Sequence, residues 1–287
     1  MNARTALLEA GDLVRFSHTL FALPFALISM LAAAGGLPPL RVVGWILVAM
    51  VGARTAAMAY NRLADHALDG RNPRTRGRSL PAGRVRRSFA WTLTAAGAAA
   101  LLLAAWELNP LCELLAPLVL AWLLGYSHAK RFTSFAHLWL GLSLGLAPVG
   151  AWLAVRGSLA VAPVLLGAAV TFWVGGFDVL YALQDEEFDR TEGLFALPAR
   201  LGGRRAILVA RAFHLLAAAG FAAFAWRVGA GPGLWLGVAA AVVLLVWQHG
   251  LVGPGRLDRL NTAFFTANGA LSLGMFALYV LDMIRGR

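Results

Sequence analysis

The sequence predicts an all-helical protein that crosses a membrane many times. Three observations lead to this fold class. Hydrophobic residues make up 60% of the 287 residues, the mean hydropathy is +0.70, and apolar runs recur along the whole chain. This composition is too apolar for a soluble domain. The spans are expected to be helices, because backbone groups inside a bilayer must find their hydrogen bonds within the chain.

Nine apolar runs have about the length needed to cross a bilayer core of ~30 Å. They cover residues 16–34, 40–62, 89–106, 111–128, 135–154, 161–184, 206–226, 233–250 and 262–284. Gly and Pro residues punctuate the segments between them. No linker is long enough for a second domain, so residues 1–287 are expected to form one transmembrane domain.

The basic residues predict the orientation of these spans. The formal net charge is +11, and most of the 25 Lys and Arg residues fall on one side of the predicted membrane. The other side holds five: Arg41, Arg156, Arg227, Arg285 and Arg287. By the positive-inside rule, the N-terminus is cytoplasmic and the C-terminus lies outside the cytoplasmic (inner) membrane. The basic residues occupy short loops and no soluble domain carries them, so no nucleic-acid partner is expected.

The end of the second span carries an unusual set of polar residues. Asn61, Asp65 and Asp69 are spaced four apart, and Arg54 lies two turns earlier. Each helical residue turns about 100°, so all four fall within an arc of about 80°. Polar groups of this kind are costly at a membrane boundary and usually mark a functional site.

A second stretch repeats this pattern at the end of the sixth span. Asp185 and Asp189 have the same spacing, and Asp178 and Tyr181 complete the same helical face. Leu80-Pro81-Ala82 also recurs, as Leu197-Pro198-Ala199. These features indicate an internal repeat that places two acidic clusters opposite each other on the cytoplasmic side.

Two facing acidic pairs suit a hard divalent cation such as Mg²⁺, which is often held by carboxylates together with substrate phosphates. Nearby basic residues would neutralise the outer phosphate oxygens; Arg74, Arg78 and Lys130 are the best placed by sequence. Tyr126 lies four residues before Lys130 and is expected to share its helical face. The chemistry that fits is ionisation of an allylic diphosphate, with the cation protected from water inside the membrane.

The chain resembles the UbiA superfamily of intramembrane prenyltransferases, and the resemblance covers the whole chain. The first motif of that family is matched by Asn61, Asp65 and Asp69, and the basic element after it by Arg74, Thr75, Arg78, Leu80, Pro81 and Gly83. The second motif is matched by Asp178, Tyr181, Asp185 and Asp189, and a third element by Tyr126, Lys130 and Arg131.

The resemblance implies helices around a central cavity open to lipid, two Mg²⁺ ions, and transfer of a polyprenyl group to an aromatic ring. It implies metal–diphosphate binding by four carboxylates: Asp65, Asp69, Asp185 and Asp189. Asn61 would position metal or acceptor, and Arg78, Tyr126 and Lys130 would contact diphosphate. Arg54 and Arg15 would lie near the acceptor or the diphosphate.

Within the superfamily, the chain resembles the 4-hydroxybenzoate polyprenyltransferase type. The sequence segments 17–25 and 54–62 resemble those of relatives in the futalosine route to menaquinone. Arg62 follows Asn61 where many 4-hydroxybenzoate enzymes have Asp, which fits the futalosine branch. Either acceptor would serve ubiquinone or menaquinone biosynthesis.

The sequence leaves two alternative functions open. One is the same fold acting on another acceptor, namely haem, a chlorophyll precursor or a lipid. The other is a secondary transporter, although transporters usually place coupling acids near the bilayer midplane. Several residues are given no site role: Glu186 and Glu187 are expected to be solvated, and Cys112 and five of the six histidines, His137 among them, to serve in packing or at the membrane interface.

Overall fold

The computed structural model describes residues 9–11, 13, 21–253 and 257–286. The long helices are α2 (Leu23–Ala34), α3 (Leu40–Ala64), α5 (Arg87–Leu108), α6 (Pro110–Ala129), α7 (Ala136–Arg156), α8 (Val161–Ala182), α11 (Gly203–Arg227), α12 (Pro232–Leu251) and α14 (Asn268–Arg285). Short elements lie between them: α4 (His66–Arg71), η2 (Leu183–Asp185), α9 (Glu186–Thr191), α10 (Leu197–Leu201), α13 (Leu260–Thr262) and the π-helical turn η3 (Ala263–Ala267).

The predicted fold class is confirmed. Eight of the described helices are long and apolar enough to cross a bilayer, and α2 is a ninth, shorter apolar helix. The expected first span begins outside the described residues, so α2 covers only its second part. The remaining spans agree with the apolar runs to within a few residues, because the requirement for a continuous apolar stretch fixes their length.

Helix boundaries follow from local sequence. Gly35 and Gly157 end α2 and α7 with φ of 65° and 63°, a left-handed conformation that glycine adopts without steric cost. Pro232 occupies the first turn of α12, where its missing N–H removes no helical hydrogen bond.

The described chain divides into two compact units. The first is built on α3, α4, α5 and α6, with α3 packed along α5. Gly52 and Gly97 allow this close packing: a Cβ on Gly97 would lie 2.5 Å from the Ala56 amide nitrogen and 2.7 Å from the Gly52 carbonyl oxygen. The backbones of α3 and α5 therefore approach more closely than larger residues would permit.

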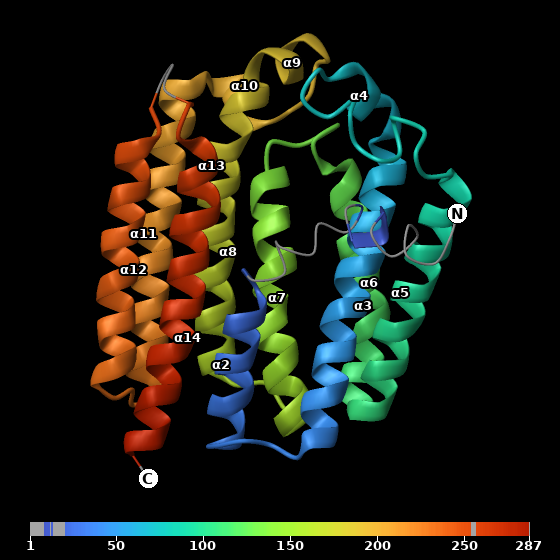
Figure 1. Ribbon diagram of the computed structural model, residues 1–287. Coiled ribbons are helices and arrows are strands. Elements are labelled where there is room, and N and C mark those ends of the chain that lie inside the picture. The colour runs from blue at the N-terminus through green and yellow to red at the C-terminus, as the bar shows by residue number, and fades with distance from the viewer. Residues whose placement is uncertain (1–8, 12, 14–20, 254–256, 287) are drawn as a thin grey trace. The chain divides into compact units, whose positions relative to one another are not determined.

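The second unit contains α2 and the helices from α7 to α14 (Figure 1). Helix α8 packs between α7 and α11, while α12 packs along α14. An aromatic core joins these elements: Trp173 of α8 and Phe25 of α2 are fully buried, and the Phe25 ring stacks on Phe221 of α11 at 5.3 Å between centroids. Trp173 Nε1 also donates a hydrogen bond to Asn268 Oδ1 of α14 at 3.0 Å.

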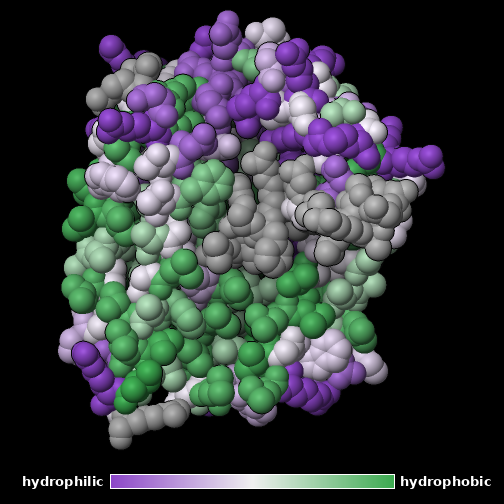
Figure 2. All heavy atoms as spheres, viewed as in Figure 1, coloured by the Kyte–Doolittle hydropathy of each residue, from purple (hydrophilic) through white to green (hydrophobic). Residues whose placement is uncertain are grey.

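The outer surface of the second unit is that of a membrane protein. Large hydrophobic side chains lie exposed along α11 and α12, including Leu215 (73% exposed) and Val243 (66%). Figure 2 shows hydrophobic residues over the middle of these two helices and hydrophilic residues gathered around α9 and α10. Extended apolar surface of this kind needs a lipid environment, and the chain is a multi-pass membrane protein.

Candidate functional site

The first acidic motif does not lie on one continuous helix, as the spacing had predicted. Helix α3 ends at Ala64, Asp65 has φ −91° and ψ 3°, and α4 begins at His66. The i to i−4 backbone bonds nevertheless continue through the break, from Asp65 N to Asn61 O (2.9 Å) and from Asp69 N to Asp65 O (2.7 Å). The chain therefore bends at the first aspartate of the pair, and the Asp65 carboxylate stays beside Asn61.

Asp65 and Asn61 form the part of this motif nearest to α6. Asn61 Nδ2 lies 3.3 Å from Asp65 Oδ2 and 3.5 Å from Ser127 Oγ. On the residue directly before Asn61, the hydroxyl of Tyr60 lies 3.0 Å from His128 Nε2. These contacts hold the end of α3 against the end of α6, and Asp65 is buried to 4% exposure.

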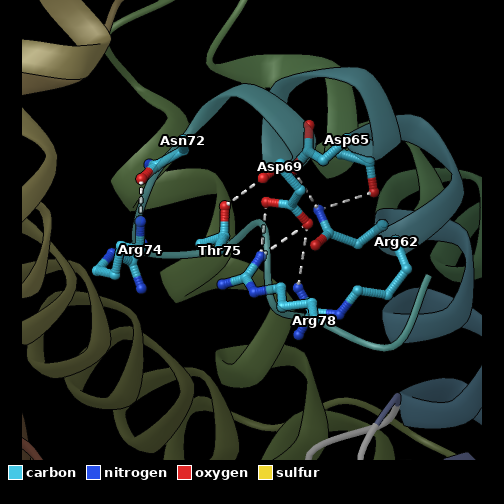
Figure 3. Close-up of polar contacts among 9 residues, drawn as sticks. Arg62, Asp65, Asp69, Asn72, Arg74, Thr75 and Arg78 are labelled. Carbon is cyan, nitrogen blue, oxygen red and sulfur yellow. Dashed lines mark hydrogen bonds and ion pairs between the residues drawn. The ribbon is translucent and has the colours of Figure 1, made fainter. Parts of the chain in front are cut away.

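Asp69 is a buried carboxylate surrounded by arginines (Figure 3). Arg78 Nη1 donates to both of its oxygens, at 2.8 and 2.9 Å. Arg62 Nη1 lies 3.8 Å from Oδ2, with 6% of the Arg62 side chain exposed. Two guanidinium groups beside one carboxylate leave a net positive charge, which suits an anionic ligand.

The basic loop after α4 is folded onto Asp69 by its own polar groups. Thr75 Oγ1 donates to the Asp69 carbonyl oxygen at 3.0 Å, and the Arg74 amide donates to Asn72 Oδ1 at 2.9 Å. Asn72 and Thr75 are buried, whereas the Arg74 side chain is exposed. The loop thus places Arg78 beside Asp69 and leaves the guanidinium of Arg74 at the surface (Figure 3).

Four further residues were predicted to belong to the site: Arg15, Arg54, Tyr126 and Lys130. Arg54 is half-buried on α3, two turns before Asn61, and Tyr126 is half-buried near the end of α6. Helix α6 ends at Ala129, so Lys130 lies just beyond the helix and the expected shared face with Tyr126 is incomplete. Arg15 is outside the described residues.

The second acidic motif bends in the same way as the first. Helix α8 ends at Ala182, a 3₁₀ turn runs to Asp185, and Asp185 has φ −106° and ψ 6° before α9 begins. Both bends use the sparsely populated bridge region of backbone conformation, which is common at active sites. The six-residue helices α4 and α9 follow the two bends at equivalent positions. The predicted repeat is therefore visible in the local structure, although Leu80–Ala82 forms turns and Leu197–Leu201 forms α10.

The four acids between residues 185 and 189 differ in their exposure. Asp189 is buried to 9% exposure and Asp185 is half-buried. Glu187 is exposed, and Glu186 pairs on the surface with Arg190 at 2.5 Å. Of these four acids, only Asp189 is buried, whereas Asp185 and Glu186 are both half-buried.

Tyr181 is packed against an aromatic residue of the turn before the last helix. Its ring lies 4.4 Å from that of Phe264, which belongs to the π-helical turn η3. Asn268 Nδ2 donates to the Phe264 carbonyl oxygen at 2.8 Å, while Asn268 Oδ1 accepts the hydrogen bond from Trp173. A π-turn leaves a backbone carbonyl without its usual helical partner, and the buried Asn268 amide supplies one for Phe264.

His137 was expected to serve in packing or at the membrane interface; it is buried, and it also makes two polar contacts that this expectation did not include. Its Nδ1 lies 2.7 Å from Asp178 Oδ2, and its Nε2 accepts a hydrogen bond from the Leu197 amide at 3.2 Å. Asp178 and Leu197 lie 41 and 60 positions after His137 in the sequence. No local spacing links them, so the sequence held no signal for this contact.

The donor chemistry of the two motifs fits Mg²⁺. Among the described residues, no three Asp, Glu, His or Cys side chains converge in a way that could hold a metal ion by themselves. Each motif instead offers two carboxylates, which are hard oxygen ligands, and Mg²⁺ usually completes such a set with water and substrate phosphates. For Asp69 to bind the metal, its ion pair with Arg78 would have to break, because Arg78 contacts both carboxylate oxygens.

Comparison with known proteins shows the family of the chain. A family profile described as "UbiA prenyltransferase family" matches residues 22–270. The 4-hydroxybenzoate octaprenyltransferase of Alkalilimnicola ehrlichii is 32% identical over 254 residues, which cover 85% of this chain and 84% of that protein. The 4-hydroxybenzoate octaprenyltransferase of Citrobacter koseri is also 32% identical, with 86% of each chain covered.

Solved structures show the same fold. The apo structure of a UbiA homologue from Aeropyrum pernix K1 has a TM-score of 0.84 and 36% identity, covering 93% of this chain and 98% of the other. A UbiA homologue from Archaeoglobus fulgidus, solved bound to DMAPP and Mg²⁺, has a TM-score of 0.73 with 19% identity, over 96% of this chain and 99% of the other. At that identity the second likeness concerns the fold alone.

Proposed function

Because the chain belongs to the UbiA prenyltransferase family, and is a prenyltransferase, we propose that it transfers a polyprenyl group from a polyprenyl diphosphate to an aromatic quinone precursor with the help of Mg²⁺. The observation that carries this proposal is the pair of broken-helix motifs. Each bends at its first aspartate, Asp65 or Asp185, and each sets a buried second aspartate on a six-residue helix.

The four motif carboxylates are proposed to hold the magnesium diphosphate: Asp65, Asp69, Asp185 and Asp189. When bound, Mg²⁺ neutralises the diphosphate and stabilises the departing pyrophosphate; two ions would match two carboxylate pairs. The Asn61 amide nitrogen faces Asp65 and Ser127, so its oxygen is the atom that it can offer to a metal or acceptor.

The basic groups are proposed to bind the outer oxygens of the diphosphate, and these groups are Arg74, Arg78, Tyr126 and Lys130. Arg78 would exchange partners during binding. In the structure, Arg78 donates a hydrogen bond to the Asp69 carboxylate. A phosphate oxygen is also negatively charged, so it can replace that carboxylate as the acceptor of the guanidinium hydrogen bonds. Asp69 would then become available to the metal. Asp178 and Tyr181 are proposed to contact the diphosphate from the second motif.

Loss of pyrophosphate leaves an allylic cation, which must be kept from water until the aromatic ring attacks it. The apolar helices exclude water, and the isoprenoid tail is compatible with the lipid around them. We propose 4-hydroxybenzoate as the acceptor, since the relatives are named 4-hydroxybenzoate octaprenyltransferases. Arg54, half-buried on α3, and Arg15 are candidate partners for its carboxylate.

One feature of this chain favours a futalosine-derived acceptor as the second candidate. Arg62 stands where many 4-hydroxybenzoate enzymes have Asp, and it is buried beside Asp69. A cation in place of an anion changes which acceptor charge the site tolerates. Both candidates place the enzyme in quinone biosynthesis at the inner membrane, with the N-terminus and the motif loops cytoplasmic and the C-terminus outside.

The experiment uses washed membranes that contain the chain, together with Mg²⁺ and prenyl diphosphates of several lengths. Parallel samples receive 4-hydroxybenzoate or aminodeoxyfutalosine, and mass spectrometry detects the prenylated product. We expect the prenylated product to form with one of the two acceptors, and EDTA should abolish its formation. Product only with a haem, chlorophyll-type or lipid acceptor would show that the quinone assignment is wrong.

A further inference from the structure

A four-residue segment after α9 makes backbone hydrogen bonds to two residues of the proposed site and to His137, the partner of Asp178. The Leu194 amide donates to the Asp189 carbonyl oxygen at 2.8 Å, and the Phe195 amide donates to the Lys130 carbonyl oxygen at 2.8 Å. The Leu197 amide donates to His137 Nε2 at 3.2 Å. We call residues 194–197 the strap.

His137 connects the strap to the second motif through a fixed tautomer. Its Nε2 accepts a hydrogen bond from a backbone N–H, which can only donate, so Nε2 carries no proton. The proton of the neutral ring therefore lies on Nδ1 and is donated to Asp178 Oδ2 at 2.7 Å. With only 4% of His137 exposed, water cannot readily replace either partner.

We propose that His137 is a positioning residue for diphosphate binding: it orients Asp178 with one ring nitrogen and fixes the strap with the other. The proposal rests on the proposed function, because it takes Asp178 and Lys130 as groups that bind the donor substrate. His137 does not itself need to touch substrate. Its side chain is buried, whereas 22% of the Asp178 side chain remains exposed to receive a ligand.

The two ring nitrogens can be tested separately. His137→Asn keeps an amide N–H near the position of Nδ1 but has no atom at the position of Nε2. His137→Gln places an amide oxygen near Nε2 and withdraws the donor from Asp178. His137→Ala removes both interactions. A matched control is His214→Asn, since His214 is also buried in the second unit (3% exposed) and its Nδ1 contacts another side chain, His249, at 2.9 Å.

The kinetic readout is the KM for prenyl diphosphate, measured separately from kcat and from the KM for acceptor. Loss of a partner that orients a binding carboxylate typically costs about tenfold to a hundredfold. We expect His137→Ala to raise the donor KM by about tenfold or more, and His137→Asn to restore most of the loss. In an Asp178→Ala background, His137→Ala should have little further effect, because its target is gone. His214→Asn should lower thermal stability without changing the donor KM.

A second readout does not depend on activity. Hydrogen exchange at the strap, followed by mass spectrometry, reports whether the Leu197 amide is bonded. We expect faster exchange in His137→Asn and His137→Ala than in His137→Gln or the wild type. An unchanged donor KM in a folded His137→Ala protein, or equal exchange in all variants, would overturn the proposal. If the wild type makes no prenylated product, the proposed function fails, while the exchange experiment still decides whether His137 holds the strap.

Discussion

The backbone at Asp65 and Asp185 determines how each acidic pair is presented. Both residues lie near φ −100° and ψ 0°, between a long helix and a helix of six residues. In each motif the second aspartate lies on the short helix and is buried, at 6% exposure for Asp69 and 9% for Asp189. The two motifs therefore share one local backbone form at equivalent positions.

Spacing predicted a set of candidate site residues but not how they are arranged. An interval of four residues fits a continuous helix as well as a bent one, so the bends at Asp65 and Asp185 could not be inferred. The ion pair between Arg78 and Asp69 depends on how the loop after α4 folds back. The contact between His137 and Asp178 joins two different helices. Long-range partners of this kind leave no periodic signal in a sequence.

At the residue scale, Arg78→Gln should strengthen binding of a divalent cation in the absence of diphosphate. The substitution frees both Asp69 oxygens from Arg78, and a hydrogen bond to a charged group contributes about 1.5–3 kcal/mol, which corresponds to about tenfold or more in affinity. Binding of Mn²⁺ to purified protein, followed by electron paramagnetic resonance, measures this effect.

The matched control for this prediction is Arg76→Gln, which removes the same charge from an exposed arginine of the same loop. It should change Mn²⁺ affinity much less. Equal gains in both variants would mean that general electrostatics, rather than release of Asp69, explains the result.

At the scale of elements, the approach of α3 to α5 depends on Gly97. A methyl group there would meet backbone atoms of α3 at 2.5 and 2.7 Å, so the helices must separate. We expect Gly97→Ala to destabilise the protein by about 1–3 kcal/mol, the usual range for overpacking. The melting temperature in detergent provides the measurement. Gly44→Ala on α3, the partner helix of α5, is the control, because a Cβ there meets nothing within 4 Å and alanine favours helix.

Asp282 of α14 caps the N-terminus of α12. Its carboxylate accepts hydrogen bonds from the amides of Gly233 and Leu234, each at 2.7 Å. Amides at a helix start lack helical partners, and a carboxylate also suits the helix dipole. We expect Asp282→Ala to cost about 1–2 kcal/mol of stability, measured by thermal unfolding, with a smaller loss for Asp282→Asn. The exposed Asp258→Ala is the comparison, and an equal loss there would contradict the capping role.

At the scale of the whole molecule, the membrane spans were the most predictable feature. Apolar runs near 20 residues have few structural alternatives, so ends such as Leu40, Arg156 and Val161 fall within a few residues of the expected limits. The helix contacts inside each unit were not predictable, because they depend on small residues such as Gly52 and Gly97 meeting across distant segments.

The predicted orientation can be tested by labelling single cysteines. Cys112 is first replaced by Ser, and Cys is then introduced at Gly77 in the basic loop or at Ser158 between α7 and α8, both exposed. A membrane-impermeant maleimide applied to intact cells should label Ser158→Cys and not Gly77→Cys. Inverted vesicles should give the opposite pattern, since basic loops stay on the cytoplasmic side. The same label pattern in both preparations would contradict the orientation.

The most direct test of the central claim is a single-turnover measurement of prenyl transfer by the purified protein. The assay follows pyrophosphate release and prenylated 4-hydroxybenzoate together, with Mg²⁺ present, for the wild type, Asp65→Asn, Asp185→Asn and the control Asp258→Asn. We predict one pyrophosphate for each product in the wild type and in the control, and a loss of at least about 10²-fold in each motif variant, as expected when a group that acts on charge in the transition state is removed. Full activity in either folded motif variant would contradict the claim that both acidic motifs serve the reaction.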